Sequence, residues 1–593
     1  MRTKLLASVL ATALLAAGCA TVPTQGPIRN SGQDGPAPAQ DGIGVEARPP
    51  RQGAKPLQLV NGFLEAMSDS AAYDVAREYL TPEAAAKWDA ESQISVYDQN
   101  SPSTVISRGR DKVQLSAPLI GTIDRRGSWT PAKRDAKVDW VFSLVQVEEQ
   151  WRVTNPPQGV YLGSNQLEPR LAPKALYFFN PGKQLLVPDP LFLPINLTPG
   201  QAATQLIQEL LKGPTSRLGN GVVSAAPPGT TVNVSVPVDD GVATVALSDT
   251  AGSLVESDRQ KLAAQIAWTL RFITNRVRIT VGGAPLLPDE PDELSLSDFG
   301  QYDPSVQDGR LKDLYGLQKG KIQRILGQDG AQDIAVKPIK ESALYSGYNA
   351  SAFAVNLRGE QGAVVTTTRN GSTIVASGLL DSANGANDEV KTIPTAGKVL
   401  RPTYDHEDNL WVLDRADSAS PRLRVRVADG TLVSVRAAFG NRSPIAFRIA
   451  PDGVRALLVL RDKRSGETSV ETATIQTNDA TQLLLTQFRP LNLALDDITD
   501  ASWNSLGILV AGKSAPGEKP RPWQVNVDGS QLRLLPGASS EFETVKIVSN
   551  TNLDTLPVVQ DADKKLHWQK KDLTWVDMSD GAPAPAIDAV YPG

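Results

Sequence analysis

The stretch SPIAFRIAPDGVRALLVL, residues 443–460, holds two short apolar segments on either side of Asp452-Gly453. In the first segment the aromatic Phe447 follows small residues, and the second segment is almost wholly apolar. Asp-Gly between two apolar runs is typical of a tight hairpin turn. The stretch therefore predicts a β-hairpin, and it decides the fold of the C-terminal half because similar stretches recur there.

Three related stretches are SAFAVN around Phe353, PTYDHEDNLWVLDR from Pro402 and DASWNSLGILVAG from Asp500. The aromatic residues Tyr404, Phe447 and Trp503 are separated by roughly 40 to 60 residues, which is the spacing of propeller blades. We therefore predict an all-β propeller of about five to seven blades over residues 300–593. A β-sandwich fits less well, because the repeat is too regular and too long.

The segment before the propeller combines helix and strand signals. Thr198-Pro199 predicts a helix start and Gly213-Pro214 predicts its end. The alternating valines of TVNVSVPV, residues 231–238, predict a strand, and Asp240-Gly241 predicts the hairpin turn into the return strand VATVAL. Ser257-Asp258-Arg259-Gln260 has the pattern of a capping box at the start of a second helix.

This segment resembles the GerMN domain, a family named for spore-germination and sporulation proteins that also occurs in envelope lipoproteins. The resemblance rests on LIQELLKGPTSRLGNGVVSAAPPGTTVNVSVPVDDGVATVALSD followed by LAAQIAWTLRFITNRVRITVGGAPLL. It implies an α/β GerMN domain over residues 170–290 that binds glycan or protein. We expect Asp239, Asp240 and Asp249 to lie in turns rather than to form a catalytic carboxylate pair.

Helix signals precede strand signals in the first folded segment. Val60, Phe63, Leu64 and Met67 fall on one helical face, and VDWVFSLVQV, residues 138–147, alternates as a strand does. Together with FLEAMSDSAAYDVAREYLTPEAAAKW and EEQWRVTNPPQGV, this order resembles the cone fold of the nuclear transport factor superfamily.

The resemblance to the nuclear transport factor superfamily implies an α+β domain over residues 56–165 and no particular activity. Trp88, Trp140 and Trp151 are candidates to line a pocket, but we expect them in the hydrophobic core.

The chain has a single cysteine, Cys19, within LLAAGCATVP, residues 14–23. A basic start and a short apolar run precede it, as in a secretory signal. The pattern resembles the lipobox of bacterial lipoproteins, although Ala16 stands where leucine is usual. The resemblance implies a signal peptide over residues 1–18 and lipid attachment at Cys19, by diacylglycerol and an N-acyl chain such as palmitate. The alternative is an ordinary cleaved signal that contains a cysteine.

Residues 19–55 are rich in Pro, Gly, Gln and Asp and contain almost no large apolar side chain. Such a composition does not bury enough surface to offset the entropy cost of ordering, so we predict a disordered tether. On a lipid-anchored chain, this tether would connect the folded part to the membrane.

The overall composition excludes several classes of protein. The formal net charge of -5 argues against a general nucleic-acid partner. The chain has two histidines, His406 and His567, and its cysteine is expected to carry lipid, so zinc or copper sites are nearly excluded. We therefore predict no metal and no cofactor besides the covalent lipid.

The sequence contains no recognised catalytic motif that would define an active site. No G-x-S-x-G, P-loop or H-E-x-x-H motif is present. The turn that contains His406 fits either a calcium or catalytic site formed by Asp405, Glu407 and Asp408 or a solvated turn between strands, and we favour the solvated turn. Glu148-Glu149 and Arg125-Arg126 have the pattern of hairpin tips. His567 lies on a predicted strand and is expected to be structural.

The order of lipobox, tether, cone-fold segment, GerMN domain and propeller resembles the LpqB family of actinobacterial lipoproteins, and GCATVPTQGPI is a distinctive part of the likeness. The resemblance implies a non-enzymatic protein on the outer face of the cytoplasmic membrane. Its expected partner is the sensor domain of the histidine kinase MtrB in the MtrA–MtrB two-component system, with effects on cell-wall homeostasis and cell division. An envelope protein that binds or hydrolyses cell-wall glycan or peptide is the alternative.

Overall fold

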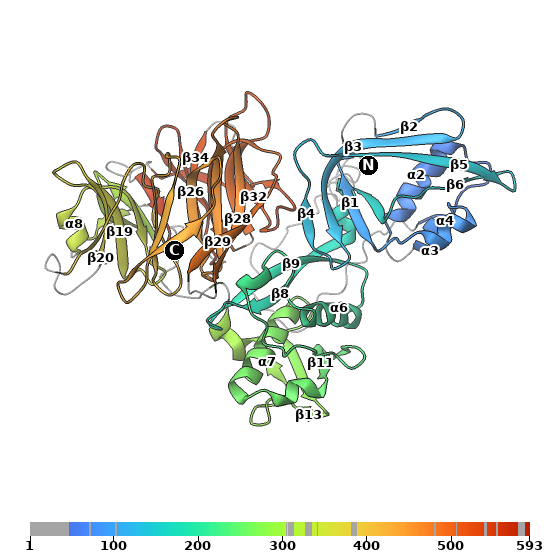
Figure 1. Cartoon of the computed structure of the whole chain (residues 1–593), viewed down its shortest axis with the longest axis horizontal. Coiled ribbons are helices and arrows are strands. Elements are labelled where there is room, and N and C mark those ends of the chain that lie inside the picture. The colour runs from blue at the N-terminus through green and yellow to red at the C-terminus, as the bar shows by residue number, and fades with distance from the viewer. Residues whose placement is uncertain are drawn as a thin grey trace, which may run out of the picture. The chain divides into compact units, whose positions relative to one another are not determined.

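The computed structural model describes residues 47–593 apart from 70–72, 101–103, 304, 306–312, 327–334, 341, 381–387, 479–481, 506, 539–542, 553–554 and 579–586. Along the chain, a helix-and-sheet segment is followed by an α/β segment and by a large all-β segment (Figure 1). The predicted multidomain organisation is confirmed. The predicted signal peptide, Cys19 and most of the predicted tether lie outside the described residues.

The first segment begins with helices, as predicted. They are α2 (Pro56–Met67), α3 (Tyr73–Arg77) and α4 (Pro82–Lys87). The strands that follow are β1 (Gln93–Tyr97), β2 (Val105–Ser107), β3 (Lys112–Asp124), β4 (Trp129–Pro131), β5 (Lys137–Val147), β6 (Gln150–Val153) and β7 (Val160–Gly163). The sheet has the order β6-β5-β3-β1-β7, and β2 and β4 both pair with β3. The predicted apolar face of α2 is buried in a core shared with the sheet.

The tryptophans of this segment belong to its core. Trp88 is 4% exposed, its ring centre lies 5.6 Å from that of Phe63, and its indole Nε1 donates to the carbonyl oxygen of Gly159 at 3.0 Å. Trp140 and Trp151 are half-buried against the same cluster. Their arrangement therefore agrees with the core interpretation.

The second segment contains a separate β-hairpin, a small sheet and two long helices. Its elements are α5 (Ser164–Arg170), β8 (Leu171–Phe179), β9 (Leu186–Pro194), α6 (Pro199–Leu211), η1 (Gly219–Gly221), β10 (Val238–Asp239), β11 (Val242–Leu247), η2 (Asp249–Ser253), α7 (Glu256–Leu270), β12 (Arg276–Val281), β13 (Ala284–Pro285), β14 (Leu294–Ser295) and η3 (Leu296–Tyr302). The sheet order is β10-β11-β12-β13, with β14 also paired to β12. Helix α7 is buried because it packs between α6, β8 and β12.

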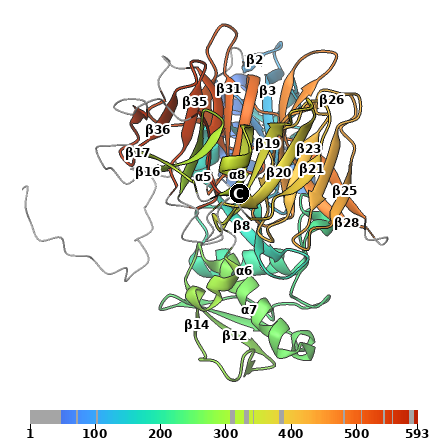
Figure 2. The same ribbon diagram turned by 90° about the vertical axis from the view of Figure 1, so that its left-hand side faces the viewer.

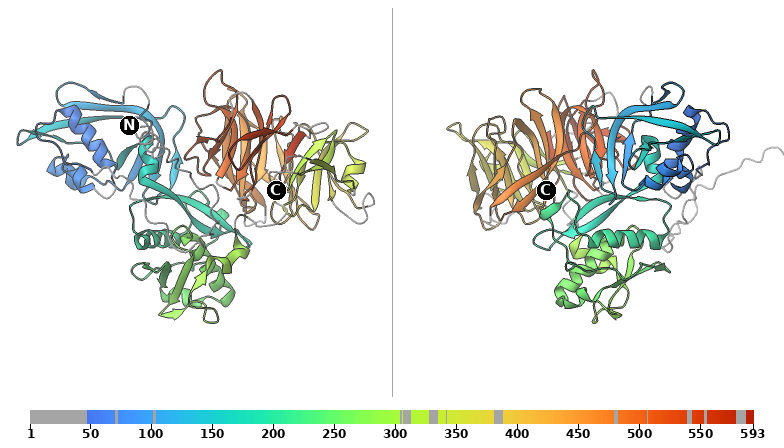
Figure 3. Two further views of the ribbon diagram at one scale, coloured as in Figure 1. Left: turned by 180° about the vertical axis from the view of Figure 1, so that it is seen from behind. Right: turned by 45° about the vertical axis from the view of Figure 1, so that its right-hand side comes forward.

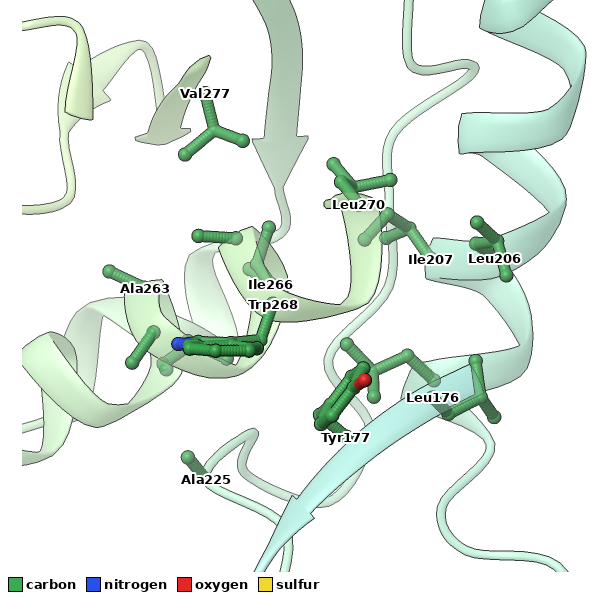
Figure 4. Packing of buried hydrophobic residues seen from close by; sticks show 14 of the residues in the cluster. Leu176, Tyr177, Leu206, Ile207, Ala225, Ala263, Ile266, Trp268, Leu270 and Val277 are labelled. Atoms are coloured by element: carbon green, nitrogen blue, oxygen red, sulfur yellow. The ribbon is translucent and has the colours of Figure 1, made fainter. Parts of the chain in front are cut away.

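Figure 4 shows the core around α7 from close by. Leu206 and Ile207 of α6 face Leu270 of α7, and the ring centre of Tyr177 on β8 lies 5.7 Å from that of Trp268. All of these side chains are buried, so the helices and the β8–β9 hairpin share one core.

Several local predictions for this segment are confirmed. Thr198 is the N-cap of α6, and its hydroxyl accepts from the backbone N–H of Gln201 at 3.3 Å. Gly213, directly after the helix, has a φ of 86°, as helix-terminating glycines do. Asp240 and Gly241 both have positive φ and join β10 to β11.

Two other predictions are wrong. Residues 231–238 do not form a long strand, since β10 contains only its last residue and Asp239. Pro237 has no N–H to donate, and the N–H of Val236 donates to the Thr204 hydroxyl at 2.8 Å instead of to a strand. The expected capping box at Ser257 is also absent, because α7 begins at Glu256 and the Asp258 carboxylate pairs with Lys183 at 3.1 Å.

Two valines within residues 231–238 are expected to differ strongly in their response to substitution. Val236 is fully buried in the shared core, whereas Val234 is 84% exposed. We expect Val236→Asp to lower the free energy of unfolding by several kcal/mol, about 3 or more, because it buries an unpaired charge. Val234→Asp is the matched control and is expected to change it by no more than about 0.5 kcal/mol. Urea unfolding followed by circular dichroism checks both values, and equal losses would contradict this assignment of the two side chains.

The third segment is a β-propeller of six four-stranded blades among the described residues. Blade 2 contains β18 (Ala350–Val355), β19 (Gln361–Thr367), β20 (Thr373–Leu379) and β21 (Lys391–Pro394), and a short helix α8 (Ala343–Gly347) precedes it. Blade 3 contains β22 (Thr403–Tyr404), β23 (Leu410–Asp414), β24 (Arg422–Arg426) and β25 (Leu432–Ala437). Blade 4 contains β26 (Arg442–Ile449), β27 (Arg455–Asp462), β28 (Thr468–Thr477) and β29 (Leu483–Pro490).

Blade 5 contains β30 (Asp496–Asn504), β31 (Gly507–Lys513), β32 (Arg521–Val525) and β33 (Arg533–Leu534). Blade 6 contains β34 (Thr544–Val548), β35 (Val558–Asp561), β36 (Leu566–Gln569) and β37 (Trp575–Asp577). The strands of successive blades lie beside one another in Figure 2. Blades 3 and 4 are joined into one continuous sheet because β25 pairs with β29.

Blade 1 closes the ring with strands from both ends of the propeller. β15 (Leu314–Gln318), β16 (Lys321–Leu326) and β17 (Ala335–Pro338) come from its start, and β38 (Ile587–Val590) comes from its end and pairs with β15. The C-terminus accordingly lies among the propeller strands in both views of Figure 3, where the N–H of Gly593 donates to the carbonyl oxygen of Val355 at 2.9 Å. Closure therefore depends on a single strand.

The innermost strands of the blades are β18, β22, β26, β30, β34 and β38, each at one edge of its blade. The repeated aromatics that predicted the propeller all lie on these strands: Phe353 on β18, Tyr404 on β22, Phe447 on β26 and Trp503 on β30. Each of these four side chains is at most 5% exposed. The aromatic residue recurs in the sequence because each of these four blades begins with an inner strand that buries one aromatic side chain.

Candidate functional site

Cys19, the predicted lipid-attachment site, lies outside the described residues and stays a prediction. Among the residues that the structure does describe, no helix is both long enough and apolar enough to cross a membrane. Within the same residues, no group of three or more His, Cys, Asp or Glu side chains is placed to hold a metal ion.

The acidic turn that holds Asp405 lies between β22 and β23. The Asp405 carboxylate accepts from the Trp411 indole at 2.8 Å and from the backbone N–H of Glu407 and Asn409. Its side chain points inward, so the expectation of a solvated turn is wrong for this residue, which is only 3% exposed. Burial raises the pKa of Asp405. The carboxylate holds the turn together through these hydrogen bonds.

The other acidic candidates and His567 lie where the sequence places them. Asp239 ends β10, Asp240 lies in the following turn, and Asp249 begins η2. Glu148 and Glu149 form the hairpin tip between β5 and β6, both with positive φ. His567 lies on β36, with its Nε2 2.8 Å from the carboxylate of Asp561.

Two of the candidate residues make contacts between segments that sequence reasoning did not anticipate. Arg126 occupies the predicted turn after β3, and its guanidinium binds the Glu209 carboxylate at 2.9 Å and the carbonyl oxygen of Gly213 at 2.7 Å. It therefore binds the end of helix α6, whose exposed carbonyls favour a cation. His406 likewise reaches Gln184, with 3.0 Å between Nε2 and Oε1.

A cluster of charged side chains on the inner strands of the propeller was missed altogether. It comprises Arg401 next to β22, Arg448 on β26, Asp500 on β30, Lys546 on β34 and Asp588 on β38. We call these five residues the channel cluster. Five of the six inner strands thus place a charge in or beside the centre of the ring.

The channel cluster is held by short ion pairs. Arg401 Nη2 lies 2.6 Å from Asp588 Oδ1, and the Lys546 ammonium binds the same oxygen. Arg448 Nη2 lies 3.4 Å from Asp500 Oδ1, and Asp500 also accepts from the backbone N–H of Ile547 at 3.2 Å. The Arg401 and Asp588 side chains are 11% and 6% exposed, so this pair is shielded from water, whereas the Lys546 side chain is 39% exposed.

The pKa values of Arg448 and Asp588 are shifted by burial and by the neighbouring charges of the cluster. Burial, with a contribution from neighbouring Arg401, lowers the pKa of Arg448 to about 10. Although burial opposes ionisation of Asp588, Arg401 and Lys546 hold the pKa of its carboxyl below the ordinary value. With three cations and two carboxylates, the channel cluster carries one net positive charge.

A signal for this cluster was present in the sequence. Arg401 and Asp500 each stand three residues before the aromatic of their repeat, and Arg448 directly follows Phe447. Charges at fixed offsets from a buried aromatic on an inner strand are expected to face the propeller axis. The sequence does not show which charges pair, because they come from strands 40 or more residues apart.

Comparison with known proteins gives one consistent result. Residues 49–168 match the family model described as "Lipoprotein LpqB, N-terminal domain", residues 175–287 match "Sporulation and spore germination", and residues 328–590 match "Lipoprotein LpqB beta-propeller domain". The chain is 28% identical to "Lipoprotein LpqB" of Cutibacterium acnes over 98% of both chains. It is 27% identical to the protein of the same name in Streptomyces coelicolor, over 98% of this chain and 96% of that one.

Among solved structures, the first GerMN domain of the sporulation protein GerM from Bacillus subtilis is 26% identical to the chain. The match covers 21% of this chain and 99% of that domain, with a TM-score of 0.17.

Proposed function

Because the chain belongs to the family of the lipoprotein LpqB, we propose that it is a lipid-anchored accessory protein that binds the extracytoplasmic sensor domain of a histidine kinase and modulates the MtrA–MtrB two-component system. The proposal places the protein on the outer face of the cytoplasmic membrane, attached through Cys19. Through the kinase it would influence cell-wall homeostasis and cell division. The observation that carries it is the likeness to LpqB proteins over nearly the whole of both chains.

Anchoring on the surface that also carries the kinase would raise the effective concentration of the two partners, so a modest interface is enough. Binding changes kinase output only if the lipoprotein prefers one signalling state, since equal affinity for both states shifts nothing. The proposed role is therefore a differential contact, made without catalysis.

The test is co-reconstitution of the full-length lipoprotein with the full-length kinase in liposomes. We expect the autophosphorylation rate of the kinase to change about fivefold or more, the lower end of ordinary allosteric coupling. The matched control is the same chain without the lipid anchor at equal total concentration, and its effect is expected to be much smaller. An unchanged rate at saturating lipoprotein would contradict the proposal.

An envelope protein that binds or hydrolyses glycan or peptide remains the second candidate function. Incubation of the same preparation with purified cell wall distinguishes the two. Release of soluble fragments that stops on changing one carboxylate to its amide would favour the hydrolase.

A further inference from the structure

A small cavity lies within the ring of inner strands. It has a volume of about 50 Å³ and is lined by residues from all six strands, including Ala354 of β18, Thr403 of β22, Arg448 of β26, Trp503 of β30, Val548 of β34 and Val590 of β38. This volume accommodates one small group rather than an extended ligand. A site built from every blade exists only when the ring is closed.

The side chains that line the cavity are cationic. Arg401 and Arg448 are its charged side chains, and none of the lining residues is Asp, Glu, Lys or His. The remaining polar lining consists of hydroxyl and amide groups, such as those of Ser549 and Asn550. The two carboxylates of the channel cluster are not among the lining residues. The lining side chains therefore present positive charge and hydrogen-bond donors, and Gly593 adds main-chain atoms to the same lining.

The donors of the cavity are incompletely used. Among the described residues, Arg448 donates to the carbonyl oxygen of Phe447 at 2.7 Å and to Asp500 at 3.4 Å, and Arg401 donates to Asp588. A guanidinium group has five N–H donors, so both arginines retain donors after these bonds. The indole Nε1 of Trp503, a residue that is 5% exposed, is buried and has no hydrogen-bond partner in the part of the chain that the structure describes. Orphaned buried donors are costly unless a ligand or water satisfies them.

We propose that this cavity binds a carboxylate group, with Arg401 and Arg448 as its cationic partners and Trp503 as an additional donor. One negative charge neutralises the single net positive charge of the channel cluster. The planar fork of arginine matches a carboxylate with two parallel hydrogen bonds. A phosphate dianion is larger and would leave one net negative charge in the channel. The carboxylate comes either from a small free acid or from an acidic side chain of a protein partner.

The experiment uses sodium acetate as the probe and the full-length lipoprotein in detergent. Saturation-transfer NMR on the acetate methyl protons, at constant ionic strength, measures binding. We expect a saturable signal for the wild type and an affinity lower by about tenfold or more for Arg448→Gln, which loses a charged donor. Arg436→Gln, an exposed arginine on β25, is the matched control and is expected to bind like the wild type.

A second variant covers the case in which Arg448→Gln does not fold. Trp503→Phe keeps an aromatic ring and removes the indole N–H, but it also removes part of a buried ring that Arg455 contacts, so we expect weaker acetate binding together with a modest loss of thermal stability. The proposal is overturned if the wild type gives no acetate signal. It is also overturned if both variants, Trp503→Phe and Arg448→Gln, bind acetate with the affinity of the wild type. Gly593 also lines the cavity. If a signal is seen only after the chain is extended beyond Gly593, the terminal carboxylate of the unextended chain occupies the site, and the proposal is overturned.

Addition of the kinase sensor domain identifies the source of the carboxylate. Displacement of acetate by the domain assigns it to an acidic side chain of that partner, and simultaneous binding assigns it to a small free acid. Both results support a carboxylate site. Acetate binding is measured without the kinase, so this inference is tested separately from the proposed function.

Discussion

Exchange of residues 1–19 for the signal peptide of an unlipidated secreted protein is expected to release the protein from cells into the culture fluid. Each methylene of an acyl chain buried in a membrane contributes about 0.8 kcal/mol, so two long chains hold a protein firmly and loss of both removes the anchor. Cell fractionation and immunoblotting measure the distribution. Mass spectrometry of the native protein is expected to show an N-terminal peptide that begins at Cys19 and carries acyl chains.

The control for this exchange is a signal peptide from another lipoprotein, including its own cysteine. That chain is expected to remain in the membrane fraction and to keep its effect on the kinase, whereas the released chain loses most of it through dilution. A native protein found unacylated in the culture fluid would contradict both the anchor and the proposed mechanism.

Asp588→Asn is expected to destabilise the propeller by about 3 kcal/mol, because it leaves the buried Arg401 without its carboxylate and removes the partner of the more exposed Lys546. Asparagine keeps the size of the side chain and tolerates the φ of 56° at this position, so the change isolates the charge. Asp588 lies on β38, the strand that closes the ring. Hydrogen exchange of peptides from β15 and β38 is therefore expected to accelerate most.

The double variant Asp588→Asn with Arg401→Gln is the control for the charge, and we expect it to recover part of the lost stability. If it is as unstable as the sum of the two single variants, the ion pair is not the cause. Asp572→Asn, in an exposed turn, is the matched surface control and is expected to leave the exchange rates of both strands unchanged.

The same carboxylate makes the stability of the wild type depend on pH. Since the pKa of Asp588 is below its ordinary value in the folded chain, its contribution is fully present above the ordinary aspartate pKa. The contribution is lost as the pH falls through the lowered value. Asp588→Asn is therefore expected to show a weaker acid dependence of β38 exchange than the wild type does.

The sequence by itself determined the elements whose causes are local. The capping of α6 at Thr198, the turn at Asp240-Gly241 and the apolar face of α2 depend on neighbouring residues, and all three were predicted. The propeller was also predictable, because each repeat places an aromatic residue on an inner strand. The likeness to LpqB is likewise a property of the sequence alone.

The tertiary structure decided what depends on residues far apart in the chain. The valines of residues 231–238 alternate like a strand, but the Thr204 hydroxyl takes the N–H of Val236, and only isolated backbone hydrogen bonds, such as that from Asn233 to Ala246, link the segment to β11. The number of blades and their closure by β38 were settled only by pairing between the two ends of the propeller. The channel cluster belongs to the same class. A charge on one strand is solvated or buried, paired or unpaired, according to its neighbours across the ring, and those neighbours exist only in the folded chain.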